Sequence, residues 1–122
     1  MAVILIADDS QTALLQLRRI LEPLGHEIVT AADGEQAARA LAKQAPPDLA
    51  ILDVVMPAPN GFELCRSLKA DPRTQTMPVF LVTSMSREAD RFWGLKQGAD
   101  EYLTKPVDAP LLVEKVRARL GT

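Results

Sequence analysis

The chain has 122 residues, of which 48% are hydrophobic and 25% charged, the composition of one ordinary globular domain. A net charge of −2 and an aromatic content of 4% argue against general affinity for nucleic acid or anionic membranes and against a base-stacking platform. The single cysteine, Cys65, cannot form an internal disulfide, which favours a reducing cytoplasm. Neither export nor membrane anchoring is expected, because no apolar run near the start approaches the ~18 residues that span a bilayer.

The first apolar run, residues 2–7, predicts a strand buried on both faces, and it ends in the pair Asp8-Asp9. An amphipathic helix is expected next, because leucines recur at three- and four-residue spacing. They are Leu14, Leu17, Leu21 and Leu24. Ser10 or Asp9 is suited to cap this helix, and Pro23 with Gly25 ends it.

Residues 26–30 combine alternation with charge, which is typical of an edge strand. Asp33-Gly34 signals a turn, and the alanine-rich residues 35–44 predict a helix that Pro46-Pro47 ends. His26 is the only histidine, and no second ligand or triad partner accompanies it. A structural role is therefore expected for His26.

The run Leu49-Ala50-Ile51-Leu52 is too short for an ordinary helix and predicts a second strand buried on both faces. This strand delivers Asp53 to its carboxyl end, where ligands collect in open α/β sheets. After Met56-Pro57, Asn60-Gly61 leads into a short helix. The residues expected to face inward on it are Phe62, Leu64, Cys65 and Leu68. Residues 71–76 form a polar connection.

The next predicted strand covers residues 79–82 and ends in Thr83-Ser84. Ser86 is expected to cap a helix that runs to Gln97. A short strand and a final helix, capped by Asp108, complete the chain. These last two elements are residues 101–103 and 109–120.

Strict alternation of five strands and five helices predicts the α/β class. Right-handed crossovers then produce a parallel sheet that helices cover on both sides. The expected architecture is one compact three-layer domain over residues 1–122, doubly wound and without an effector domain.

Polar residues follow several predicted strands at the same edge of the sheet: Asp8-Asp9, Asp53, Thr83 and, after the last strand, Lys105. Clustered carboxylates repel unless something positive lies among them, and Mg²⁺ prefers hard oxygen ligands. A carboxylate is also a nucleophile toward phosphorus, and a cation, an ammonium and a hydroxyl neutralise a transferred phosphoryl group. Each residue alone has a structural reading as a helix cap, an exposed lysine or a strand end, but their convergence favours a site.

These motifs resemble the receiver domain of two-component response regulators across nearly the whole chain. They are Asp8-Asp9, Asp53-x-x-Met56-Pro57 with Gly61, Thr83-Ser84 and Tyr102-Leu103-Thr104-Lys105-Pro106. Within that family the chain is most similar to free-standing chemotaxis-type regulators, especially those of type IV pilus (twitching motility) systems. Residues 8–12, 60–62 and 92–106 carry this narrower likeness. The resemblance also supplies the flavodoxin-like strand order 2-1-3-4-5.

The resemblance implies a role for each residue of the site. Asp53 would accept a phosphoryl group from a sensor histidine kinase. Asp9, Asp53 and the backbone carbonyl of Val55 would hold Mg²⁺, with Asp8 acting largely through bound water. Lys105, joined to Pro106 by a cis bond, would pair with the phosphoryl oxygens, and Thr83 would donate its hydroxyl to them and move toward them.

The resemblance also implies how the signal leaves the domain. Tyr102 would be the switch aromatic, turning inward as Thr83 vacates space. An output protein would read the face formed by the fourth helix, fifth strand and fifth helix of a monomer, or of a dimer formed on phosphorylation. In the family, the positions two beyond the acceptor and two beyond the switch threonine tune dephosphorylation. Here they are Val55 and Met85, both apolar, so the resemblance implies a long-lived phosphate on Asp53.

The sequence also fits other functions. The same acceptor chemistry suits a phosphorelay intermediate or a phosphate sink. A Mg²⁺-dependent phosphatase would use the same aspartyl phosphate but normally needs a general acid and a substrate cap, and a phosphorylation-independent module would be expected to lack part of the acidic set. Apart from the resemblance, Tyr102 is read as a half-buried strand aromatic and Cys65 as helix packing.

Phe92 and Trp93 are adjacent in the fourth predicted helix, so their side chains point about 100° apart and cannot both face the core. One reading has one ring packed inward and the other covering the flank of the helix. The alternative is that one of them belongs to a partner-binding surface.

Overall fold

The computed structural model describes residues 1–43 and 45–121, and within them five strands alternate with five α-helices. The strands are β1 (Val3–Ala7), β2 (Glu27–Ala31), β3 (Leu49–Leu52), β4 (Val79–Thr83) and β5 (Glu101–Thr104). The helices are α1 (Gln11–Leu21), α2 (Gly34–Leu41), α3 (Gly61–Ala70), α4 (Glu88–Lys96) and α5 (Ala109–Leu120), with a short 3₁₀ helix, η1 (Glu22–Leu24), after α1. The predicted alternation is confirmed.

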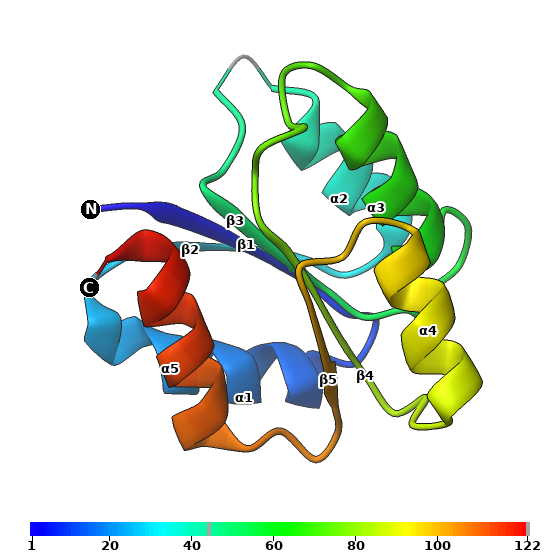
Figure 1. The fold of residues 1–122 in the computed structure, drawn as a ribbon. Coiled ribbons are helices and arrows are strands. Elements are labelled where there is room, and N and C mark those ends of the chain that lie inside the picture. Colours follow the sequence, from blue (N-terminus) through cyan, green and yellow to red (C-terminus); the bar gives the residue numbers. More distant parts are fainter. Residues whose placement is uncertain (44, 122) are drawn as a thin grey trace.

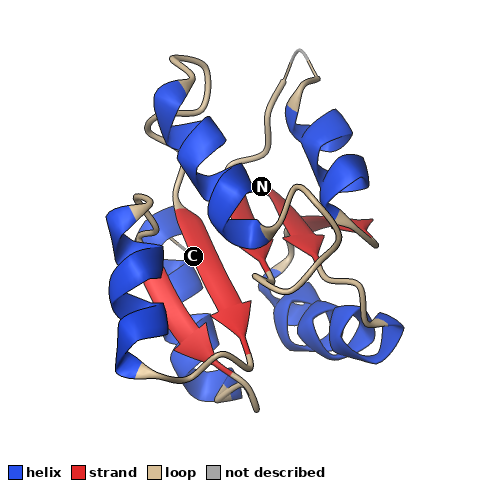
Figure 2. Cartoon of the chain, turned by 90° about the vertical axis from the view of Figure 1, so that its right-hand side faces the viewer, coloured by secondary structure: helices blue, strands red, loops and turns tan. Residues whose placement is uncertain are grey.

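All neighbouring strands run parallel, in the order β2-β1-β3-β4-β5. Helices α1 and α5 lie on one face of this sheet, and α2, α3 and α4 lie on the other (Figure 1). Figure 2 shows the strands between the two layers of helices. The three-layer, doubly wound α/β fold is therefore confirmed, together with the position of β2 at an edge of the sheet.

Two apolar clusters, one on each face of the sheet, form the core. In β1, Ile4 and Ile6 pack toward the cluster under α1 and α5, whereas Leu5 and Ala7 pack toward the cluster under α2 and α3. This division follows from the alternation of side chains along a strand. Every residue of β3 and β4 is buried, since helices cover both faces of the sheet there.

The start of α1 resolves the choice between the two candidate caps. The Ser10 hydroxyl accepts a hydrogen bond from the Ala13 amide at 3.2 Å, so Ser10 is the N-cap. The α-helix ends at Leu21, and its continuation to Leu24 tightens into η1, which contains Pro23. Gly25 then closes the segment at φ 85°, in the left-handed region that glycine tolerates.

Helix α2 ends at Leu41, so the predicted helix over residues 35–44 was too long; Gln44 itself lies outside the described residues. A side chain distant in sequence donates to carbonyl oxygens at the end of this helix and just beyond it. The Arg73 guanidinium donates to the carbonyl oxygens of Leu41 at 3.3 Å and Lys43 at 2.6 Å. No pattern within residues 35–44 predicts the contact with Arg73.

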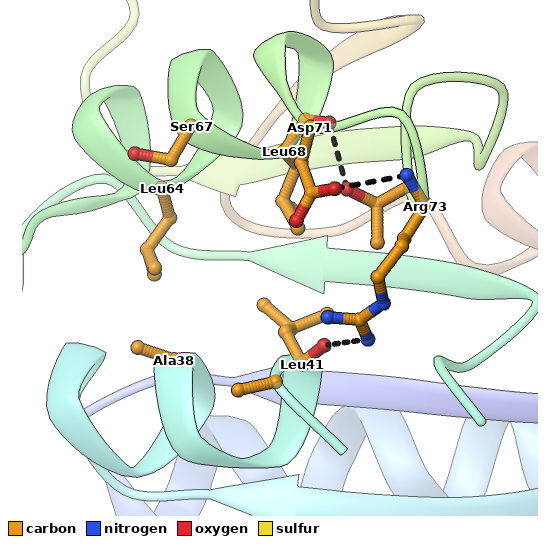
Figure 3. A pocket seen from close by; sticks show the side chains of 9 residues that line it. Ala38, Leu41, Leu64, Ser67, Leu68, Asp71 and Arg73 are labelled. Atoms are coloured by element: carbon orange, nitrogen blue, oxygen red, sulfur yellow. Dashed lines mark hydrogen bonds between the residues drawn. The ribbon is translucent and has the colours of Figure 1, made fainter. Parts of the chain in front are cut away.

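Arg73 also closes one side of a cavity of about 170 Å³ between α2 and α3 (Figure 3). The lining residues drawn from the two helices include Ala38, Leu41, Leu64, Ser67 and Leu68. Each helix begins at the edge of the sheet that carries Asp53, and the cavity extends toward their far ends. It is therefore separate from the acidic residues.

The predicted cap of α4 was wrong. Arg87, not Ser86, is the N-cap, and the Asp90 carboxylate accepts hydrogen bonds from the Arg87 backbone amide and guanidinium, each at 3.2 Å. The Asp90 carboxylate thus satisfies the backbone amide of the N-cap residue, whereas a capping hydroxyl would accept from an amide inside the first turn.

Neither aromatic of α4 packs inward. Phe92 is 63% exposed and Trp93 is 52% exposed, so the reading in which one of them joins the core was wrong. The buried positions of α4 are Asp90 and Gly94, four residues apart on one face, and the aromatics lie outside that stripe. Within the described residues, no helix is both long and apolar enough to span a bilayer.

Candidate functional site

The backbone of the sheet holds each main candidate residue just beyond the end of its strand. The Asp53 amide donates to the Ala7 carbonyl at 2.9 Å, and the Asp8 amide donates to the Ala31 carbonyl at 3.1 Å. Beyond β5, the Lys105 amide donates to the carbonyl of Thr83 at 2.9 Å. These bonds extend the ladder by one residue, so the side chains leave the sheet from fixed positions.

Lys105 joins the carboxylates of two different strands. Its Nζ lies 2.7 Å from Asp8 Oδ2 and 3.2 Å from Asp53 Oδ2. The other oxygen of each carboxylate is held by a local amide: Asp8 Oδ1 accepts from Ser10 at 2.9 Å, and Asp53 Oδ1 accepts from Val55 at 3.2 Å. Both carboxylates are therefore fixed in orientation before any ligand arrives. The Lys105–Pro106 peptide bond is cis, as the resemblance implies.

The electrostatics of this cluster follow from its burial. Asp8 is 1% exposed, and its burial raises the pKa of its carboxyl group, although hydrogen bonds from Lys105 and Ser10 act in the opposite direction. Burial of the Lys105 ammonium alone would lower its pKa, but the bond to Asp8 and the charges of Asp53 and Asp8 outweigh that effect and the pKa is raised. Lys105 is thus held firmly as a cation between two carboxylates.

A third carboxylate completes an acidic cluster that is able to bind a metal ion. One oxygen from each of Asp8, Asp9 and Asp53 lies within 4.8 Å of the other two. Asp9 is exposed whereas Asp8 and Asp53 are buried, so the cluster opens to solvent on one side. Hard oxygens with room for water are the ligand set that Mg²⁺ prefers. Val55 is 54% exposed, and the role of its carbonyl stays a prediction.

Thr83 and Tyr102 both form hydrogen bonds to the backbone of Met85. Thr83 is fully buried at the end of β4, and its hydroxyl oxygen accepts from the Met85 amide at 3.4 Å. The Tyr102 hydroxyl donates to the Met85 carbonyl at 2.7 Å. Tyr102 is 2% exposed, so it lies in the inward position and is more deeply buried than its residue type alone suggests.

Two glycines near the acidic cluster have a role that the sequence pattern did not reveal. A Cβ on Gly34 would overlap the carbonyl of Pro59, and a Cβ on Gly61 would overlap the carbonyl of Asp53. The loop after β3 therefore packs against the starts of α2 and α3 more closely than any side chain would allow. The Asp33-Gly34 pair, which predicted a turn, was the only local signal at Gly34.

His26 and Cys65 do not belong to this cluster. His26 Nδ1 accepts the Ala2 amide at 3.0 Å, in keeping with a structural role. Cys65 is fully buried, and burial raises the pKa of its thiol to about 11. Its Sγ lies 3.5 Å from the carbonyl oxygen of Gln97, which fits a packed core cysteine.

A doubly wound sheet with an acidic cluster and a bridging lysine at its carboxyl edge defines a class of signalling domain. Residues 4–117 match the family described as "Response regulator receiver domain", and the chain belongs to this family of two-component signalling proteins. The resemblance seen in the sequence motifs is therefore confirmed.

Individual proteins of this family are similar to the chain over nearly its whole length. The chain is 45% identical to Protein PilH of Pseudomonas aeruginosa over 121 residues, covering 99% of each chain, which supports the likeness to type IV pilus regulators. A putative response regulator from Chloroflexus aurantiacus is 33% identical, with a TM-score of 0.91 and coverage of 99% and 98%. The receiver domain of sensor histidine kinase PA1611 from P. aeruginosa, solved with magnesium in its active-site cleft, is 26% identical, with a TM-score of 0.88 and the same coverage.

Proposed function

We propose that this chain is a phosphorylation-activated switch that accepts a phosphoryl group on Asp53 from a sensor histidine kinase and then signals by protein–protein contact. The arrangement of Lys105 between Asp8 and Asp53 carries this proposal. It unites a nucleophilic carboxylate, a fixed cation and further acidic ligands at one edge of the sheet. Membership of the receiver family and the full-length likeness to PilH support it.

In the transfer step, a carboxylate oxygen of Asp53 attacks phosphorus while the bond from phosphorus to the kinase's histidine nitrogen breaks, and the electron pair stays on the imidazole. Lys105 moves its hydrogen bonds to the incoming phosphoryl oxygens, and the Thr83 hydroxyl donates another. Asp9 and Asp53, with the Val55 carbonyl and water held by Asp8, would bind Mg²⁺. When bound, that ion supplies charge neutralisation for the phosphoryl group.

The signal leaves the domain through the face formed by α4, β5 and α5. Tyr102 lies beneath α4, and Phe92 and Trp93 are exposed on it, so a change at Met85 reaches both the ring and the outer surface through adjoining residues. An output protein in chemotaxis or twitching motility is the proposed reader, and the cytoplasm is the proposed compartment. The chain acts as a monomer, or as a dimer once phosphorylated.

The environment of Asp53 favours a signal over a phosphate sink. Val55, two residues beyond the acceptor, is exposed and apolar, and Met85 is half-buried. Neither side chain has a polar atom that would position water for attack on phosphorus, in keeping with a long-lived phosphate. The chain is not proposed to turn over external phosphate esters. A relay intermediate would use the same Asp53 chemistry.

The test is thermal unfolding with Mg²⁺ and beryllofluoride, which mimics a phosphoryl group on a carboxylate. We expect a concentration-dependent rise in melting temperature, because a ligand present at 100 times its dissociation constant stabilises the folded state by about 2.7 kcal/mol. Asp53→Asn removes the acceptor and should abolish the response to beryllofluoride. Absence of a Mg²⁺-dependent shift in the parent protein would refute the proposal.

A further inference from the structure

Helix α4 has a glycine where it contacts the sheet. A Cβ built on Gly94 would lie 2.7 Å from Cδ2 and 2.8 Å from Cε2 of Tyr102, and 3.1 Å from Cδ1 of Leu81. Cβ atoms in folded proteins essentially never lie as close to another heavy atom as the first two distances. The ring of Tyr102 therefore occupies space that exists only because residue 94 has no side chain.

Other contacts fix the same ring. Its hydroxyl donates to the Met85 carbonyl at 2.7 Å. The Arg91 guanidinium lies 5.4 Å from the ring centroid, and Arg91 Nη1 donates to the Tyr102 carbonyl at 3.0 Å. We call the site formed by Gly94, Leu81, Arg91 and Met85 the Tyr102 socket.

The Tyr102 socket connects to the phosphoacceptor edge through one residue. Met85 receives the tyrosine hydroxyl on its carbonyl, and its amide donates to Thr83 Oγ1 at 3.4 Å. Because that amide occupies a lone pair of the Thr83 oxygen, the hydroxyl proton is left to donate elsewhere. Tyr102 in its socket thus favours a Thr83 hydroxyl that is ready to donate to a phosphoryl group.

We propose that Gly94 is a positioning residue: by lacking a side chain it admits Tyr102 beneath α4, and so couples the position of α4 to phosphoryl binding at Asp53. This inference rests on the proposed function of Asp53. Glycine inside a helix lowers helix stability relative to alanine, so its presence in α4 calls for a structural explanation. Coupling of this kind is reciprocal, so a change at Gly94 alters affinity at the acidic cluster.

The test combines Gly94→Ala with measurements on the Tyr102 ring and on beryllofluoride binding. Tyr102 is the only tyrosine, so ring-labelled tyrosine gives a single set of NMR signals for the socket. We expect those signals to shift in the variant, and the affinity for beryllofluoride with Mg²⁺ to fall by at least about fivefold, the lower end of usual coupling. Burial raises the pKa of Tyr102, so a displaced ring should also titrate at lower pH.

A double variant separates the socket from a general effect of alanine in α4. Tyr102→Val keeps a strand-forming residue and has no atom beyond Cγ to meet a new Cβ. In that background Gly94→Ala should leave beryllofluoride affinity unchanged. If Gly94→Ala fails to fold, recovery of folding in the double variant supports the socket, and failure to recover overturns it.

The remaining outcomes are also decisive. Unchanged ring signals in Gly94→Ala would overturn the socket, and shifted signals with unchanged affinity would overturn its coupling to Asp53. If the parent protein itself does not bind beryllofluoride, the proposed function and the coupling fall together, while the tyrosine signals still decide whether Gly94 positions the ring.

Discussion

At the scale of single residues, Lys105 is the side chain on which the acidic cluster depends. It contacts Asp8 and Asp53, which are both buried, while about a quarter of its own side chain is exposed. Without the Lys105 charge, the fixed carboxylates of Asp8 and Asp53 would lie close to each other and to that of Asp9, with no cation between them. Folding such a cluster costs free energy because like charges repel, as is usual for a site that is arranged to bind a positive ligand.

Lys105→Met should lower the free energy of unfolding by about 2 kcal/mol at neutral pH without Mg²⁺, somewhat less than the loss of one partner of a fully buried pair. The loss should shrink as the pH falls. The raised pKa of Asp8 means that this carboxyl takes up a proton earlier than an ordinary one, and its neutral form needs no partner. Urea unfolding at a series of pH values measures this.

Lys96→Met is the matched control, since Lys96 is exposed, and its effect should stay within about 0.5 kcal/mol. A loss for Lys105→Met that is constant from neutral to acid pH would show that packing, not charge, is what Lys105 contributes.

At the scale of elements, α4 is the unusual helix. Its buried positions are Gly94 and Asp90, Arg91 donates to the Tyr102 carbonyl of β5, and its large apolar residues face solvent. The exposed set is Phe92, Trp93 and Leu95. A helix with this distribution is held by few apolar contacts, which suits an element that shifts when its neighbours change.

Phe92→Ala and Trp93→Ala should each change the free energy of unfolding by no more than about 0.5 kcal/mol, because both rings are largely exposed. Each should weaken binding of the output protein to the phosphorylated or beryllofluoride-bound chain, since exposed aromatics dominate recognition surfaces. Calorimetric unfolding and a binding titration measure the two effects.

Leu112→Ala in α5 gives the contrasting control: this residue is fully buried, and its truncation should cost about 2–5 kcal/mol. A comparable loss of stability from either aromatic substitution, with partner binding intact, would instead assign the rings to packing.

At the scale of the whole molecule, buried groups that titrate at high pH set an alkaline limit to stability. The Cys65 thiol has a pKa of about 11 in the folded protein, against an ordinary value of 9.0. The unfolded chain therefore releases this proton first as pH rises. The contribution to stability is complete below about pH 9 and is lost on approaching pH 11, an effect of about 2–3 kcal/mol.

Cys65→Ala should consequently be less stable than the parent near neutral pH, by the cost of a small cavity, yet lose less stability between pH 9 and 11. The pKa of Tyr102 is also raised, so its ionisation lowers the stability of the parent and of Cys65→Ala alike. It therefore does not obscure the difference between the two proteins. If the stabilities of the parent and of Cys65→Ala fell in parallel between pH 9 and 11, the Cys65 thiol would not be the cause of the alkaline loss.

Much of this architecture is determined by the sequence alone. Apolar runs such as residues 49–52 are too short for ordinary helices and predict buried strands, and their alternation with amphipathic segments predicts a parallel sheet whose carboxyl ends share one edge. That constraint places Asp8, Asp53 and Lys105 at one edge of the sheet, since each directly follows a strand, and the strand order then brings them close together.

Tertiary contacts decided the rest, because those contacts join residues that no local pattern relates. Helix α2 stops where the distant Arg73 meets its carbonyls, and Tyr102 lies inward because Gly94, on another element, leaves it room. A glycine in a helix looks like a local defect when only propensity is considered. Once the opposing ring is in place, the missing side chain is what permits α4 and β5 to pack.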